Sequence, residues 1–292
     1  MRLLSRAIIL LYIAFSFYSC DIINPEEAIP AYLQIDTISF ISTNPSHGTS
    51  NQKITEAWVT VNDVFLGVYD LPARVPVLES GRVAVEVNAG IKDNGIGRLP
   101  EIYPFFEPYK VDVELIPAET IQLNPTTSYK EDLNFAFVEE FEVGGNLFTD
   151  DLDGNDTTSL VSSSIDVFEG NRSGLIRLTE SHPVAELATD FSNKFEDLQA
   201  RGVEVYLELN YKTDVEVAFG IIGHEESVFS PTEKIYEPVL FPRASWNKVY
   251  LNLSETVFVV QGEAYQIAIL TALAPGQTAG NVYLDNIKLI HF

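Results

Sequence analysis

From residue 32 to its end, the chain consists of short segments in which apolar and polar residues alternate, separated by turn-forming residues. Successive side chains of a β-strand point to opposite faces, so this alternation indicates strands with one buried face. Representative segments are YLQIDTISFIS, ITEAWVTV, RVAVEVNAGI, KVDVELI, VEVYLELNYK, VEVAFGIIG and YQIAILTAL. Regularly spaced short strands are typical of β-sandwiches and jelly rolls, so the sequence predicts an all-β fold.

One segment suggests a helix instead. Apolar residues recur at helical spacing within residues 184–201, at Leu187, Phe191, Phe195 and Leu198. Two polar residues between them weaken the pattern, which therefore indicates no more than two or three turns.

The length of 292 residues exceeds the usual size of one domain. A polar stretch containing a proline, residues 123–128, separates two groups of strand-like segments. We therefore expect two β-sandwich domains in series, the first at residues 32–124 and the second, a jelly roll, at residues 133–292. Residues 125–132 are expected to form the linker between them.

The charge of the chain bears on its partners. Eighteen basic residues stand against 42 acidic ones, which gives a formal net charge of -24. Such a chain repels phosphates, so nucleic acid is excluded as a partner.

The first residues indicate export. Arg2 and Arg6 precede an apolar stretch at residues 7–18, which is too short to span a bilayer and is typical of a secretory signal peptide, here residues 1–19. The only cysteine, Cys20, follows it. The sequence Phe17-Tyr18-Ser19-Cys20 resembles a lipobox, which implies a diacylglyceryl and N-acyl lipid on Cys20 and an acylated tether at residues 20–31. A free cysteine behind an ordinary signal peptide, or an uncleaved anchor, are the alternatives.

Further resemblances concern both domains. Residues 20–120 resemble uncharacterised lipoproteins of the Bacteroidota type through CDIINPEEAIP, ITEAWVTVND, YDLPARVPVL and AGIKDNGI, and residues 59–90 look like a PEGA-type or Ig-like sandwich. This resemblance implies an outer-membrane location, with the leaflet undecided. Residues 137–292 are similar to the galactose-binding-like jelly rolls of carbohydrate-binding modules. The similar segments are FEVGG (141–145), WNKVYL (246–251) and VYLDNIKL (282–289).

The second resemblance implies a structural calcium ion. In such domains an acidic residue of the opening strand and an aspartate of the closing strand ligate calcium, and Glu142 and Asp285 fall at the matching positions, with Glu140 as a further candidate. Carboxylates and carbonyls are the oxygen ligands that calcium prefers. The alternative is that Glu142 faces water and that Asp285 merely ends a strand.

An aromatic run is the clearest candidate for binding. Tyr103, Phe105, Phe106 and Tyr109 lie in a segment whose prolines prevent regular strand pairing. These rings are expected either to form an exposed site for a protein partner or a glycan, or to be buried between the two domains. Trp246 is a second candidate for glycan binding, although its strand pattern also fits a core residue.

Modification and catalysis leave weaker signals. Thr37 and Thr157 lie in short patterns that resemble the O-glycosylation sites of envelope proteins. The four histidines show no metal-ligand spacing, and the chain contains no nucleophile elbow, phosphate loop or dinucleotide fingerprint. We therefore expect a protein that is not an enzyme.

Three functions follow from these observations. The first is a lipid-anchored envelope lipoprotein that serves as a non-catalytic binding or accessory subunit of an outer-membrane protein complex. The alternative is a carbohydrate-binding surface lipoprotein. The third is a glycoside hydrolase, which needs two carboxylates about 5 to 9.5 Å apart in a cleft.

Overall fold

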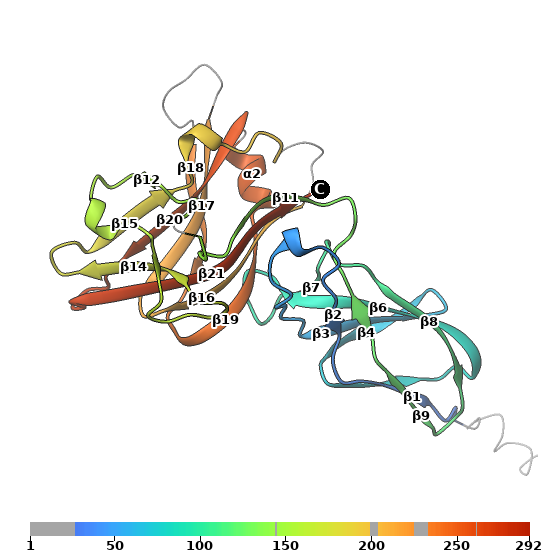
Figure 1. Ribbon diagram of the computed structural model, residues 1–292. Coiled ribbons are helices and arrows are strands. Elements are labelled where there is room, and N and C mark those ends of the chain that lie inside the picture. The colour runs from blue at the N-terminus through green and yellow to red at the C-terminus, as the bar shows by residue number, and fades with distance from the viewer. Residues whose placement is uncertain (1–26, 144, 199–203, 225–232, 261) are drawn as a thin grey trace, which may run out of the picture.

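The computed structural model describes residues 27–143, 145–198, 204–224, 233–260 and 262–292. The predicted signal peptide, Cys20 and most of the tether lie outside these residues. The described chain forms two β-sandwich units (Figure 1), so the prediction of an all-β fold with two sandwiches in series is confirmed. Among the described residues, no helix has the length and apolar character needed to cross a membrane.

The N-terminal unit consists of two main sheets. In one, β1 lies between β5 and β9, and in the other the order is β4-β3-β6-β7, with β8 also paired to β6. The strands are β1 (Ala31–Ile35), β2 (Ser39–Phe40), β3 (Glu56–Val61), β4 (Val64–Asp70), β5 (Ala73–Val77), β6 (Gly81–Lys92), β7 (Pro100–Ile102), β8 (Tyr109–Leu115), β9 (Thr120–Leu123) and β10 (Thr126–Thr127). Asn62 and Asp63 join β3 to β4 with φ angles of 47° and 64°, as tight hairpin turns require.

The C-terminal unit is a sandwich of two larger sheets. The first has the order β13-β14-β21-β16-β19, with β11 also paired to β21, and the second has the order β12-β15-β20-β17-β18. The strands are β11 (Asn134–Glu139), β12 (Asp150–Asp151), β13 (Val161–Ser163), β14 (Ser173–Thr179), β15 (Val184–Ala188), β16 (Val205–Thr213), β17 (Glu216–His224), β18 (Glu233–Leu240), β19 (Arg243–Asn252), β20 (Ala264–Ala272) and β21 (Ala279–His291). The α-helix α2 (Ser254–Val260) packs against this unit.

Short 3-10 turns complete the described elements. They are η1 (Pro45–His47), η2 (Asp156–Thr158) and η3 (Phe191–Asn193). The helix suggested for residues 184–201 is therefore wrong over its described part. Val184–Ala188 pairs with β20 along its length, and a single 3-10 turn follows, because strand pairing within the sandwich outweighs the helical spacing.

The alternation in β16 explains how the two units meet. Val205, Leu207 and Leu209 point into the core of the C-terminal sandwich. Tyr206 and Glu208 point to the outer face of the same sheet, yet they too are buried, because the N-terminal unit covers that part of the sheet. The core of the N-terminal unit therefore extends onto the outer face of this sheet, where it includes Tyr206, Tyr250 and Ile290, and it is distinct from the core inside the C-terminal sandwich.

The segment predicted as a linker is packed into this junction. β10 pairs with β2 in parallel, and Tyr129 is buried against the ring of Phe106. A further backbone bridge joins Asp93 of the N-terminal unit to Tyr250 of β19. Figure 1 shows the C-terminus of the chain at this junction, where Phe292 packs on Phe105 with their ring centroids 5.2 Å apart.

Candidate functional site

The predicted aromatic site is the core of the junction. Tyr103, Phe105 and Phe106 are at most 4% exposed, and the Tyr103 ring lies edge-on to Tyr206 of the C-terminal unit, with centroids 5.2 Å apart. Tyr109 is half-buried at the start of β8. The structure thus corrects the prediction of a partner or glycan site on these rings. It supports the alternative of burial between the domains, because the outer face of β16 offers the rings a second apolar surface.

A buried ionic cluster lies beside these rings. One oxygen of Glu208 accepts hydrogen bonds from the hydroxyls of Tyr103 and Tyr129, both at 2.8 Å, and its other oxygen lies 2.8 Å from Nζ of Lys248. The positive charges of Lys248 and Lys288 hold the pKa of Glu208 below its ordinary value, although burial alone raises it. Every member of the cluster is buried, so the cluster joins the two units.

The two carboxylates predicted to bind calcium approach one loop. Glu142 accepts hydrogen bonds from the backbone N–H groups of Asn171 and Arg172, at 2.6 and 3.0 Å. Asp285 accepts from the backbone of Phe168 and Glu169, and burial raises its pKa to about 7. These N–H donors occupy oxygen lone pairs that a calcium ion would use.

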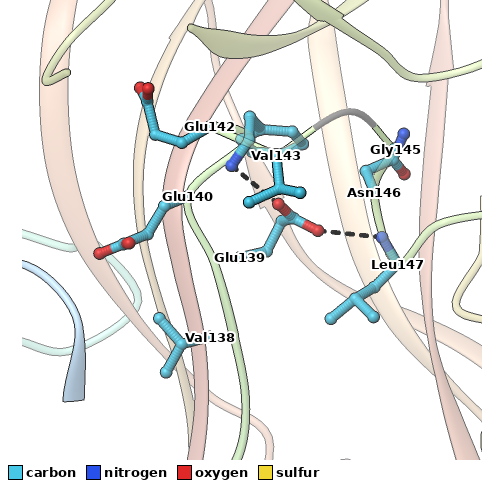
Figure 2. Close-up of a pocket in the computed structure, with 9 residues that line it drawn as sticks. Val138, Glu139, Glu140, Glu142, Val143, Gly145, Asn146 and Leu147 are labelled. Carbon is cyan, nitrogen blue, oxygen red and sulfur yellow. Dashed lines mark hydrogen bonds between the residues drawn. The ribbon is translucent and has the colours of Figure 1, made fainter. Parts of the chain in front are cut away.

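Figure 2 shows the residues around Glu142 in the opening turn of the C-terminal unit. Glu139 turns towards Leu147 and accepts its backbone N–H at 3.0 Å, while Glu140 and Glu142 extend to the other side. In the described part of the chain, no three acidic, histidine or cysteine side chains gather closely enough to hold a metal ion. A calcium ion here would need main-chain carbonyls for most of its ligands, and it stays a prediction.

A different arrangement surrounds Trp246 on the outer face of the larger sheet. Lys212 of β16 pairs with Tyr283 of β21, and Trp246 of the adjacent strand β19 lies beside them, at an irregularity in the β16–β19 pairing. All three side chains are partly exposed, and the ring centroids of Trp246 and Tyr283 lie 6.4 Å apart. We call these three residues, together with Phe168, the Trp246 row.

The loop between β13 and β14 fixes the geometry of this row. Asp166 accepts a hydrogen bond from the indole N–H of Trp246 at 2.8 Å and forms an ion pair with Lys212. Burial opposes the ionisation of Asp166, but the hydrogen bonds from Lys212 and Trp246 outweigh burial and lower its pKa. The ring of Phe168 lies 5.7 Å from that of Trp246 and extends the aromatic surface. Trp246 therefore has a fixed orientation and a partly exposed face.

The sequence predicted Trp246 as a binding residue but did not predict the residues around it. Lys212 and Tyr283 belong to strands far apart in the chain, and only the folded sheet shows that they lie next to one another and to Trp246. Asp166 and Phe168 come from a loop whose sequence carries no motif. Of the other predicted sites, Thr37 and Thr157 have exposed side chains, and their modification stays a prediction.

Comparisons with known proteins give only distant similarities. No protein family and no curated protein matches the chain. Among solved structures, the CBM22-1 xylan-binding domain of Xyn10C from Paenibacillus barcinonensis is 12% identical and aligns over 54% of this chain and 94% of its own, with a TM-score of 0.38. A point mutant of CBM29-2, a family 29 carbohydrate-binding module, is 15% identical over 55% and 85%, with a TM-score of 0.35. The family 11 carbohydrate-binding module of Clostridium thermocellum is 12% identical over 51% and 96%, with a TM-score of 0.33.

Proposed function

We propose that this chain is a non-catalytic glycan-binding protein and that the Trp246 row is its sugar site. The observation that carries the proposal is the placement of two partly exposed aromatic rings, Trp246 and Tyr283, beside Lys212 on a rigid sheet. Aromatic faces offer a large apolar surface with a polar edge, and neighbouring polar groups fix the orientation of a ligand. This combination suits a sugar ring, which has an apolar face and a rim of hydroxyls.

Different residues of the row would bind different parts of a sugar. The Trp246, Tyr283 and Phe168 rings would pack against the apolar face of a sugar, while Lys212 would bind hydroxyls at its rim. Because Asp166 already holds the indole in place, little side-chain freedom is lost when a sugar binds. Asp166 is bound to Lys212 and Trp246 at once, which suits it to fixing the site rather than to acid catalysis.

The tryptophan content gives a direct test, because the chain has only two tryptophans, Trp58 and Trp246. A Trp58→Phe variant leaves Trp246 as the single tryptophan, so its fluorescence reports on the row alone. Titration with a panel of neutral polysaccharides and their oligosaccharides should shift or quench this emission in a saturable way. The Trp246→Phe variant, in which only Trp58 emits, is the matched control and should not respond.

Binding itself is then measured by calorimetry with the glycan that gives the signal. Trp246→Ala and Tyr283→Ala should each weaken binding by about tenfold or more, since each removes a large contact surface. Trp58→Ala removes a tryptophan of the other unit and should leave the affinity unchanged. A panel that yields no saturable response, or equal losses in the Trp58 and Trp246 variants, would refute the proposal.

We further propose that a lipid on Cys20 holds the protein at the outer membrane. Support comes from the sequence alone, in which the one cysteine follows directly after an apolar segment typical of a signal peptide. At least two acyl chains are needed for stable attachment. Labelling cells with an alkyne-bearing fatty acid should mark the wild-type protein and leave a Cys20→Ala variant unlabelled; label in both would contradict the proposal.

A second candidate function, docking of a protein partner, is favoured by the edge strand β4. Val64 and Phe65 are 57% and 54% exposed, and Val68 is 37% exposed, on a strand that pairs only with β3 among the strands of the described chain. Exposed apolar edge strands are sites at which another chain can add. A pull-down from native envelopes with tagged wild type and a Phe65→Glu variant tests this role. A stoichiometric partner lost from the variant supports docking at β4, and a partner retained by both proteins excludes this edge.

A further inference from the structure

A cleft of about 720 Å³ opens where the two units meet, on a side formed by the β18–β19 turn and by residues 92–97 of the N-terminal unit. Its volume lies within the range of pockets that bind small ligands. None of the described residues that line it is acidic, although 42 of the 292 residues in the chain are Asp or Glu. Four of its lining residues are basic: Lys53, Lys92, Arg243 and Lys248.

Two of these four cations are neutralised by protein carboxylates. Lys92 forms ion pairs with Glu56 and Asp70, and Lys248 pairs with Glu208 in the buried cluster. Lys53 and Arg243 form no ion pair with any residue in the described ranges. The cleft therefore holds two positive charges without an ion-pair partner among the described residues, in a protein whose net charge is -24.

Lys53 and Arg243 both line the cleft, and their positive charges repel each other. Nζ of Lys53 donates a hydrogen bond to Oδ1 of Asn247 at 2.6 Å, which fixes the ammonium group beside β19. Burial lowers the pKa of Lys53 and the positive charge of Arg243 lowers it further, and together these effects outweigh the negative charge of Glu56, which raises it. Mutual repulsion between like charges is relieved when an anion lies between them.

Apolar side chains form the rim of the cleft. Phe241 is 65% exposed, Ile96 is 48% exposed and Val239 is 42% exposed. Exposed apolar residues grouped at the mouth of a pocket are typical of ligand sites. A ligand that fits both features has a negative charge at one end and an apolar face beside it.

We propose that this cleft binds an acidic saccharide through a carboxylate, with Lys53 and Arg243 as the anion-binding residues and Phe241 as the surface for a sugar ring. Arg243 can bind a carboxylate through two parallel hydrogen bonds, and Lys53 adds a point charge. The negative charge of the whole protein does not oppose this binding strongly, because at physiological salt charges more than about 8 Å apart are largely screened. The site is separate from the Trp246 row, whose aromatic residues do not line the cleft.

Calorimetry of the full mature chain with trigalacturonate, its methyl ester and inorganic sulfate tests the proposal. Trigalacturonate should bind, and its affinity should fall as salt concentration rises. The methyl ester has the same ring and no charge, so it should bind at least about tenfold more weakly, as expected for the loss of charge-assisted hydrogen bonds. Equal binding of acid and ester, or binding of sulfate alone, would overturn the assignment to an acidic saccharide.

Matched variants test whether trigalacturonate binds in the cleft. Lys53→Gln and Arg243→Gln should each weaken trigalacturonate binding by about tenfold. Both side chains are exposed, so these variants should fold as the wild type does, which circular dichroism checks. Lys110→Gln removes the same charge from a lysine that is exposed, paired with Glu86 and outside the cleft, and it should bind as wild type does. Equal losses in all three variants would show a general charge effect and refute the site.

The proposal and the glycan site can fail separately. A Trp246→Ala variant retains every cationic residue of the cleft, so it should bind trigalacturonate with unchanged affinity. If Trp246→Ala abolishes trigalacturonate binding while Lys53→Gln does not, the acidic saccharide lies on the Trp246 row and the cleft proposal is wrong.

Discussion

The hydroxyl of Tyr103 in the N-terminal unit donates a hydrogen bond of 2.8 Å to the carboxylate of Glu208 in the C-terminal unit. Both side chains are at most 1% exposed, and Tyr129 donates to the same oxygen. The two sandwiches are therefore joined by a buried, charged hydrogen-bond network as well as by apolar contact. Breaking such a network costs more than the loss of its individual bonds, because the partners stay buried without compensation.

Glu208→Gln should test how strongly this network holds the units together. The substitution keeps the shape of the side chain but leaves Lys248 without its counter-charge, since Nζ of Lys248 lies 2.8 Å from the carboxylate. We expect a loss of about 3–5 kcal/mol in the free energy of unfolding, measured in urea at pH 7. Glu86→Gln breaks an exposed pair with Lys110 and should cost less than about 1 kcal/mol. Similar losses in both variants would contradict a special role for the buried network.

The same junction shows what sequence alone can predict. The alternation along β16 predicts a strand, but not that both of its faces are buried, because the second face is covered by residues about 100 positions away. For the same reason the aromatic run at Tyr103 left two alternatives, an exposed site or a domain interface. Its burial depends on the docking of the second unit, which no local pattern encodes.

The Trp246 row was only partly predictable for a related reason. A tryptophan is a candidate by residue type, whereas the positions of Lys212 and Tyr283 beside it follow from the way three strands distant in sequence assemble into one sheet. A shift of one residue would turn these side chains to the other face of the sheet. Register depends on packing over the whole sandwich, so the row became visible only in the folded structure.

Lys288 should give the protein a stability that rises with pH in the alkaline range. Its side chain is fully buried and donates to the backbone oxygen of Thr49, and burial lowers its pKa to about 8. In the unfolded chain the pKa of a lysine is about 10.4, so between these two values the unfolded state binds more protons. The free energy of unfolding must then rise with pH across this window, and below it the cost of burying the charge is present in full.

Lys288→Met removes this titration and provides the measurement. Urea unfolding of wild type and variant from about pH 7.5 to 10.5 should show the wild type gaining stability relative to the variant by up to about 3 kcal/mol. Other groups titrate in both proteins, so their contributions cancel in the difference. Parallel curves over the whole range would show that Lys288 is not titrating with a lowered pKa.

Gly220 in β17 should not tolerate a side chain. A Cβ atom there would lie against the backbone carbonyl oxygen of Ile235 in β18, and the backbone cannot give way as a flexible side chain can. We expect Gly220→Ala to lower the free energy of unfolding by about 1–3 kcal/mol, measured by thermal denaturation. At Gly97 a Cβ meets nothing within 4 Å, so Gly97→Ala should change stability by less than about 1 kcal/mol. Equal stability of the two variants would mean that the β17–β18 pair can separate without cost.

The predicted calcium ion can be tested without knowing its ligands. An ion held by Glu142 and Asp285 stabilises the folded state by mass action, so the melting temperature should rise with calcium and fall in a chelator. Glu142→Gln should abolish the dependence, since the amide lacks the charge that calcium prefers. Glu79→Gln, an exposed carboxylate of the N-terminal unit, is the control and should keep it. A wild-type melting temperature that is equal in calcium and in chelator would discard the ion and leave both carboxylates as acceptors for the backbone of residues 168–172.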